Sequence, residues 1–196
     1  MNINLILASC NPGKLTEFQS MANSNPSIHL ELLPGFVTLA TFHENAATFA
    51  ENAAGKALHY SQFTNGLIFA DDSGLVVPAL GGAPGVHSAR CAGPHATDAQ
   101  RNEKLLKEMA ALTGDTRRAH FICAIVAAQK NRAVAVITAR VDGEILPAPR
   151  GSTGFGYDPI FFIRELDKTF AELSANEKNK ISHRGKAFRR LLEVLR

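Results

Sequence analysis

Continuous apolar runs predict the strands in the first part of the chain. Residues 3–8 (INLILA) and residues 67–70 (LIFA) are short and apolar throughout, which is typical of buried strands. Residues 30–39 form another strand region with a break at Pro34–Gly35. The first run ends in the turn SCNPGK and a helical segment follows, so strand, glycine-containing turn and helix form the opening unit.

Apolar residues at helical spacing predict four helices. The first covers residues 15–22, and the second is an alanine-rich helix over residues 46–62. A third begins at the capping pattern Thr97–Gln100, and Ser182 caps the last. The expected buried positions are Leu15, Phe18, Met21 and Ala22, then Phe49, Ala53, Ala57 and Tyr60, then Leu105, Leu106 and Met109, and last Phe188, Leu191, Leu192 and Leu195.

The second half of the chain combines a hairpin with long loops. The β-rich runs 119–128 and 132–141 flank a short polar turn and predict an antiparallel hairpin. Asp142–Gly143 is a second tight-turn signal. Residues 80–93 and 147–162 hold too much glycine and proline for regular structure, and long loops in compact domains are often functional.

Composition places the chain among ordinary globular proteins. It has 196 residues, of which 45% are hydrophobic and 20% charged. The net charge of +3 is too small to indicate a nucleic-acid binder, although clustered positive charge could serve an anionic small molecule. Together with the order of elements, this predicts a single α/β domain over residues 1–196, with a mixed sheet and flanking helices.

Cysteine usage and hydropathy favour the cytoplasm. Cys10, Cys91 and Cys123 are far apart and form no C-x-x-C pair, so neither a disulfide framework nor a zinc site is expected. No stretch approaches the roughly 18–20 apolar residues of a membrane span. The N-terminus has no basic region before its apolar run, so it does not resemble a signal peptide. We therefore expect a cytoplasmic enzyme or binding protein.

Two adjacent aspartates follow an apolar run in FADDSGLVV, residues 69–77. Successive side chains of a strand point to opposite faces, so Asp71 and Asp72 cannot both face one ligand if the strand continues. Asp, Ser and Gly also favour turns. The residues alone therefore leave two interpretations, a plain turn or a site with one functional carboxylate.

Two loop segments carry groups that suit phosphate. The turn SCNPGK, residues 9–14, precedes a helix N-terminus, where outward backbone amides and the helix dipole favour an anion, and Lys14 adds charge. The spacing is not that of a Walker A motif, and an ordinary strand-to-helix turn is the other interpretation. Arg90, in HSAR, is either a phosphate ligand or a loop anchor.

Polar residues around the second helix are also open to two interpretations. Glu44 lies just ahead of it, and Asn52 and Lys56 are i, i+4 neighbours on it. Glu44 can be a ligand or can compensate the helix dipole. Asn52 and Lys56 can face a ligand or simply form a solvated face, and each residue taken singly favours the simpler interpretation.

The segment GSTGFGYD, residues 151–158, is more specific. Glycines on both sides of Phe155 remove side chains around its ring, so a planar ligand could stack there. Asp158 follows in an extended conformation before Pro159. The other interpretation is a tight bend in which Phe155 and Tyr157 belong to the core.

Basic residues gather near the last helix. Lys178 lies in NEKNK, and His183 and Arg184 begin the helix after SHRGK. Arginine donors match the paired acceptors of a 6-oxopurine, and Lys178 would suit a phosphate or the base oxygen. Cations at a helix start are unfavourable by about 0.3–1 kcal/mol, which favours an anionic or carbonyl partner. With the separated carboxylates, this inventory describes a site for a purine nucleoside polyphosphate and Mg²⁺.

The chain resembles the inosine triphosphate pyrophosphatase family over nearly its full length. The matching stretches are LASCNPGK, TFAENAAGKA, FADDSGLVVPALGGAPGVHSAR, GSTGFGYDPIFF and NEKNKISHRGKA. The resemblance implies an elongated α/β fold with two lobes around a central cleft, and a homodimer. It also implies Mg²⁺-dependent hydrolysis of ITP, dITP and XTP to the monophosphate and pyrophosphate.

The same resemblance implies site residues. Asp72 matches the catalytic proton acceptor and a metal ligand, and Glu44 matches a second metal-binding carboxylate. The implied substrate contacts are Ser9, Cys10, Asn11, Pro12, Gly13 and Lys14 with Lys56 at the triphosphate, Ser73, and Phe155, Gly156, Tyr157, Asp158, Lys178, His183 and Arg184 at the nucleotide. Asp71 would then point away and support a turn through backbone hydrogen bonds.

The sequence departs from the family pattern at Cys10 and at Thr153, where glycine is common, and both departures affect loop geometry. Two alternatives to the implied activity stay open. One is a septum-inhibition-type pyrophosphatase for pyrimidine or modified nucleotides, against which the FGYD and SHR segments argue. The other is a non-catalytic nucleotide sensor, against which the presence of both Glu44 and Asp72 argues.

Overall fold

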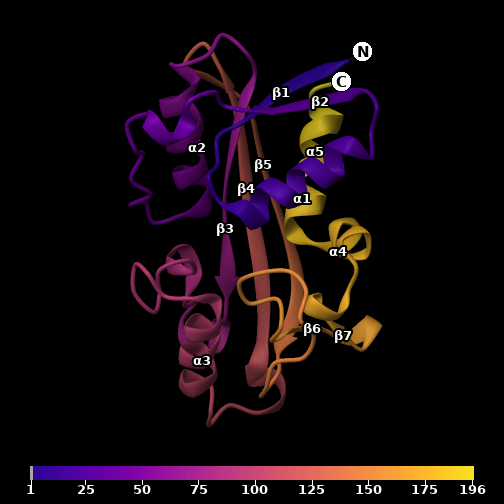
Figure 1. Cartoon of the computed structure of the whole chain (residues 1–196). Coiled ribbons are helices and arrows are strands. Elements are labelled where there is room, and N and C mark those ends of the chain that lie inside the picture. Colours follow the sequence, from indigo (N-terminus) through magenta and orange to yellow (C-terminus); the bar gives the residue numbers. More distant parts are fainter. Residues whose placement is uncertain (1) are drawn as a thin grey trace.

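A seven-stranded mixed sheet runs the length of the elongated molecule, in the order β2-β1-β3-β4-β5-β6-β7 (Figure 1). The computed structural model describes residues 2–196. The first three strands are parallel and the others antiparallel. The strands are β1 (Ile3–Leu7), β2 (Ile28–Leu32), β3 (Ile68–Val76), β4 (Arg118–Gln129), β5 (Arg132–Ile145), β6 (Phe161–Ile163) and β7 (Lys168–Thr169). The predicted mixed sheet is confirmed.

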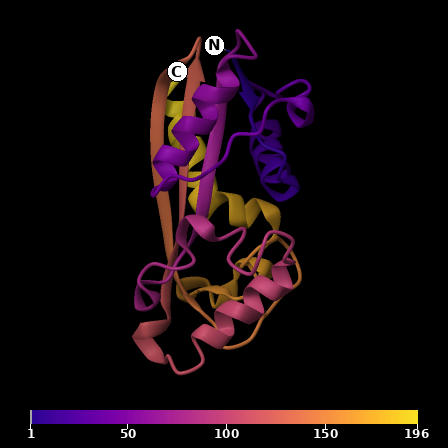
Figure 2. The same ribbon diagram turned by 90° about the vertical axis from the view of Figure 1, so that its left-hand side faces the viewer.

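Helices cover both faces of this sheet. α1 (Pro12–Asn23) and α5 (His183–Val194) pack on one face through a core that includes Phe18, Phe69 and Phe188. On the other face, α2 (Phe49–Ser61) presents its small residues to β3 and β4. Figure 2 shows α2 and α1 on separate sides of the strands.

Of the two remaining helices, α3 (Asp98–Glu108) lies at the end of the molecule away from α1 and α2, and α4 (Ala175–Ile181) lies just before α5 (Figure 1). α3 contributes Leu105 and Met109 to a core with β4, β5 and β6. The short α4 leads directly into α5. The long β4–β5 hairpin joins the two ends (Figure 1). None of the helices in the described part of the chain has the length and apolar character needed to cross a membrane.

Local capping sets where the helices begin. The predicted caps at Thr97–Gln100 and Ser182 are confirmed. α2 starts later than predicted because Thr48 caps it, in a reciprocal capping box with Glu51. α1 starts earlier, at Pro12, because the Asn11 side chain accepts the Lys14 N–H at 3.0 Å.

The turn predicted at Asp142–Gly143 and the turn interpretation of DDSG are both wrong, because in both places the chain continues as a strand. Asp142–Gly143 lies inside β5, and a Cβ on Gly143 would be 2.6 Å from the carbonyl oxygen of Phe162. The DDSG segment lies inside β3, and a Cβ on Gly74 would be 2.5 Å from the carbonyl oxygen of Gly85. Both glycines allow a neighbouring segment to approach the strand closely.

Candidate functional site

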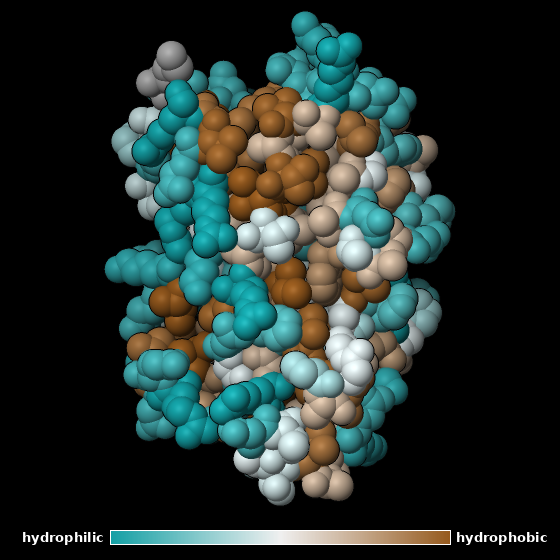
Figure 3. Space-filling model, turned by 180° about the vertical axis from the view of Figure 1, so that it is seen from behind, coloured by the Kyte–Doolittle hydropathy of each residue, from teal (hydrophilic) through white to brown (hydrophobic). Residues whose placement is uncertain are grey.

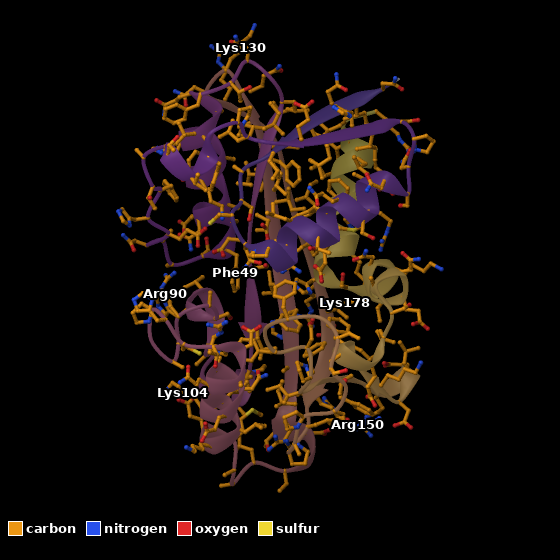
Figure 4. All side chains as sticks on the ribbon, in the orientation of Figure 1. Phe49, Arg90, Lys104, Lys130, Arg150 and Lys178 are labelled. Carbon is orange, nitrogen blue, oxygen red and sulfur yellow. The ribbon has the colours of Figure 1, made fainter. Side chains whose placement is uncertain are left out.

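A cleft of about 550 Å³ opens beside the middle of β3, a volume suited to a small-molecule ligand. In Figure 4 the labelled Arg90 and Lys178 lie on opposite sides of the central strands at this height. Most of the predicted site residues line the cleft, and Pro12 and Gly13 do not. Those that do are Ser9, Cys10, Asn11, Lys14, Glu44, Lys56, Asp72, Ser73, Phe155, Gly156, Tyr157, Asp158, Lys178, His183 and Arg184.

β3 directs its two aspartates to opposite faces, as strand alternation predicts. Asp71 faces α1 and α5 and is fully buried, and its carboxylate lies 2.8 Å from Lys14 Nζ and 3.7 Å from Arg184 Nε. Ser73 Oγ donates to it at 3.2 Å. Burial alone would raise the pKa of Asp71, but the Lys14 and Arg184 charges lower it to about 2. The expectation that Asp71 supports a turn is wrong, because it balances the half-buried Lys14 and the buried Arg184.

Asp72 faces α2, where Asn52 Nδ2 donates to its carboxylate at 3.0 Å. Asn52 is fully buried, and its own oxygen accepts the Ala46 N–H at 2.9 Å. Burial, with the added negative charge of Glu44, raises the pKa of Asp72 to about 6, although Lys14 and the Asn52 hydrogen bond oppose the shift. Of the two interpretations of Asn52, the solvated face is therefore wrong.

Glu44 reaches the same end of the cleft from the segment before α2. It forms an ion pair with Lys56, which is also buried rather than solvated. Arg90 donates to the carbonyl oxygen of Glu44 at 2.8 Å and therefore anchors this segment. Arg90 also lines the cleft, so the geometry leaves room for both of the roles considered for it.

The donor set of Glu44 and Asp72 fits a hard divalent cation. Residues 2–196 contain no group of three or more histidine, cysteine, aspartate or glutamate side chains that could hold a metal. Magnesium typically uses one or two protein carboxylates together with substrate phosphates. Glu44 and Asp72 supply two such carboxylates in one cleft, and their proximity is reflected in the Glu44 charge that helps raise the pKa of Asp72.

Glu17 pairs with the cations at the other end of the cleft, and no sequence pattern predicted it as a site residue. Its carboxylate lies 2.6 Å from Lys178 Nζ and forms an ion pair with Arg184. Burial opposes ionisation, but these two cations lower the pKa of Glu17. The available signal was a carboxylate one position before Phe18, on the buried side of α1.

His183 is a buried residue with free polar atoms. Its ring stacks on Phe121 at 4.6 Å, and neither ring nitrogen has a hydrogen-bond partner among the described residues. Burial, then the charges of Arg184 and Lys178, place the pKa of His183 well below its ordinary value. The ring is therefore neutral at neutral pH and offers a ligand one donor and one acceptor nitrogen.

The GSTGFGYD segment divides between the cleft and the core. Lys178 Nζ and Arg184 Cζ lie 4.9 and 5.3 Å from the centroid of the Phe155 ring, which also approaches α1 closely. A Cβ on Gly13 would be 2.5 Å from that ring. Tyr157 is buried, and its hydroxyl donates to the carbonyl of Ser88 at 2.9 Å. Both side chains line the cleft, but Phe155 is half-buried, whereas Tyr157 belongs mainly to the core.

The fold and the cleft define an α/β protein with two carboxylates and two lysines at one end of its site and an aromatic ring with buried nitrogen donors at the other. The chain belongs to the Ham1 family, whose sequence model matches residues 5–194. It is 46% identical to a dITP/XTP pyrophosphatase of Geobacillus kaustophilus over 189 residues, which are 96% of this chain and 92% of that protein.

Solved structures share the fold. A HAM1 protein from Coxiella burnetii superposes with a TM-score of 0.87 at 41% identity and covers 98% of both chains. The nucleoside-triphosphatase, or dITP/XTP pyrophosphatase, from Mycobacterium abscessus gives a TM-score of 0.76 at 37% identity, over 97% of this chain and 99% of that one. The elongated two-lobed fold implied by the sequence is thereby confirmed.

Proposed function

We propose that this protein hydrolyses the non-standard purine nucleotides ITP, dITP and XTP to the monophosphate and pyrophosphate, and so cleanses the nucleotide pool. The observation that carries the proposal is the arrangement of one cleft. At one end is Asp72 with a pKa of about 6, and at the other are an aromatic ring and buried nitrogen donors. The names of similar proteins support the same reaction.

In this proposal Glu44 and Asp72 hold Mg²⁺, which when bound supplies Lewis-acid polarisation and neutralises phosphate charge. Asp72 accepts a proton from the attacking water, since a carboxylate with a pKa of about 6 is mostly ionised at neutral pH. The water oxygen bonds to the α-phosphorus, and the bond from that phosphorus to the bridging oxygen breaks. Lys14 and Lys56 balance the charge of the departing pyrophosphate.

The opposite end of the cleft selects the base. Phe155 stacks on the purine, while Arg184 and Lys178 donate to its 6-oxo group and neutral His183 adds a polar contact. Adenine carries an amino donor at that position and would present it to these cationic donors in place of an acceptor, which can give strong rejection. The first turn, with Ser9, Cys10 and Asn11, and Ser73 complete the contacts.

The experiment is pyrophosphate release from ITP, XTP, ATP and GTP, with and without Mg²⁺. We expect release from ITP and XTP that depends on Mg²⁺. Equal rates on ATP and ITP would contradict the base selection. UTP and dTTP extend the panel, because a preference for them would indicate a septum-inhibition-type enzyme. Undiminished ITP after long incubation would indicate a nucleotide sensor. The names of the relatives do not favour either alternative.

Further parts of the proposal concern organisation and location. We propose one domain and a homodimer. Figure 3 shows hydrophobic side chains gathered on the rear face, and Val134 and Val136 of β5 are 50% and 57% exposed. Sedimentation of the purified protein tests the dimer. A cytoplasmic location is supported by Cys10, Cys91 and Cys123, which are all free thiols. The net charge gives no support for a nucleic-acid partner.

A further inference from the structure

Helix α3 contributes two side chains to the loop that carries Phe155. Asp98 Oδ2 accepts the N–H of Gly156 at 2.7 Å. Asn102 Nδ2 donates to the carbonyl oxygen of the same glycine at 3.1 Å. The two residues are four positions apart, so they share one face of the helix. One helix face therefore holds both polar backbone groups of Gly156, the residue next to the aromatic ring.

The two glycines beside Phe155 make the backbone of this loop flexible, so contacts from other segments are needed to fix its conformation. Gly154 and Gly156 have φ angles of +76° and +65°, in the left-handed region. A Cβ on Gly156 would meet nothing within 4 Å, so its glycine is required by conformation and not by space. Glycines on both sides of Phe155 leave the ring free to move in an unsupported chain. Asp158 holds the Phe155 N–H at 2.8 Å, and α3 holds the next residue.

The two α3 side chains are themselves held in place. Arg101 forms an ion pair with Asp98 and donates to the carbonyl oxygens of Ala89, at 3.1 Å, and Ala96. Asn102 is buried, which restricts its side chain to few conformations. Because the Asp98 and Asn102 side chains are fixed before any ligand binds, they can determine the position of the Phe155 ring.

We infer that Asp98 and Asn102 are positioning residues for the nucleobase end of the site: by gripping Gly156 they hold the Phe155 ring where a purine base stacks. They act through the loop, and neither is required at the triphosphate end. The inference rests on the proposed function, which assigns the base to Phe155. It predicts that loss of the grip weakens binding of the base and spares binding of the phosphate chain.

The test compares two ligands by titration calorimetry with Mg²⁺ present. Inosine monophosphate carries the base, and inorganic triphosphate carries only the phosphate chain. For Asp98→Ala and Asn102→Ala we expect the Kd of inosine monophosphate to rise about tenfold, the size of one lost hydrogen bond, and the Kd of triphosphate to change less than twofold.

Matched variants separate positioning from general damage. Glu103→Ala removes a carboxylate from the exposed side of α3, where it pairs with Lys107, and should leave both affinities unchanged. Asp98→Asn retains an acceptor for Gly156 and should keep inosine monophosphate binding within about threefold of wild type. Asn102→Asp keeps the volume but replaces the donor with an acceptor, so it should weaken binding at least as much as the alanine variant.

Other outcomes would overturn the inference. Unchanged inosine monophosphate binding in both alanine variants would do so, as would equal weakening of both ligands, which indicates a general structural role. If the wild-type protein binds triphosphate but not inosine monophosphate, Phe155 is not a stacking surface for the base and the inference fails. A wild type that binds inosine monophosphate yet leaves ITP uncleaved would contradict the proposed hydrolysis, and the binding comparison would still decide the inference.

Discussion

The surroundings on the two faces of β3 shift the pKa values of two neighbouring carboxylates in opposite directions. On the α1 and α5 side, Asp71 faces Lys14 and Arg184, and their charges lower its pKa to about 2. On the α2 side, burial and the nearby carboxylate of Glu44 raise the pKa of Asp72 to about 6, although Lys14, Lys56 and the neutral donor Asn52 oppose the shift. Both residues are buried, so burial does not explain the difference. The arrangement of neighbouring charges does.

The difference separates a structural carboxylate from a reactive one. A carboxylate whose charge is fully balanced stabilises the fold and has little reason to take up a proton near neutral pH. A carboxylate that lacks this balance can bind a cation or accept a proton. The contrast therefore supports the proposed role of Asp72, and each prediction below tests one side of it.

The largest effect is expected on turnover in Asp72→Asn. The amide cannot accept the proton of the attacking water, and it is a poor ligand for a divalent cation. We expect the rate of pyrophosphate release from ITP to fall about 10³-fold, within the range found for general bases. Asp142→Asn, which removes an exposed carboxylate from β5, is the control and should keep the wild-type rate. Near-normal turnover in Asp72→Asn would remove Asp72 from the mechanism.

A smaller effect is expected from pH. Because the protonated form of Asp72 can neither accept a proton nor bind a cation well, kcat/KM for ITP should fall about tenfold per pH unit below its pKa of about 6. Additional Mg²⁺ should shift this fall in kcat/KM to lower pH, because the cation favours the ionised carboxylate. A rate that stays flat from pH 7 to pH 4.5 would show that another group accepts the proton.

The smallest effect is expected on the Asp71 side. Ser73 Oγ donates to Asp71 and accepts from Arg184 at 2.9 Å. Ser73→Ala should lower the free energy of unfolding by about 1 kcal/mol, the usual net value of such a bond. Urea denaturation measures this change. Because Ser73 is also a proposed substrate contact, the KM for ITP should rise about threefold, and an unchanged KM would limit Ser73 to Asp71 and Arg184.

Strand alternation and helix spacing were enough to predict the sheet, the main helices and the separation of Asp71 from Asp72. The expected buried positions Phe49, Ala53 and Ala57 of α2 are indeed buried. These features depend on local periodicity, which a sequence displays directly. The family resemblance predicted most of the residues that line the cleft, although they come from segments far apart in the chain.

Features that depend on distant contacts could not be predicted in this way. Gly74 and Gly143 follow Ser and Asp, as glycines of turns do, yet each lies in a strand because another segment packs against it. The spacing of Asn52 and Lys56 is also that of a solvated helix face. Both are nevertheless buried, because Asn52 contacts Asp72 and Lys56 contacts Glu44. Glu17 is a site residue only because it pairs with Lys178 and Arg184, which lie more than 150 positions further along the chain.

The central claim makes opposite stability predictions for the two aspartates. The pKa of Asp72 in the fold, about 6, exceeds its ordinary value of 3.8, so its contribution to stability is complete below pH 3.8 and is lost as the pH rises through 6. The pKa of Asp71, about 2, lies below 3.8, so its contribution is present above pH 3.8 and is lost as the pH falls through 2.

The most direct test is urea unfolding of wild type, Asp71→Asn and Asp72→Asn at pH 8. Asp71→Asn leaves the buried Arg184 and its neighbour Lys14 with less opposing charge, and it should lower the free energy of unfolding by about 3 kcal/mol. Asp72→Asn removes an unfavourable buried charge, and it should raise that free energy by about 2–3 kcal/mol, an advantage that disappears near pH 4. Shifts in the same direction for both variants would contradict the account.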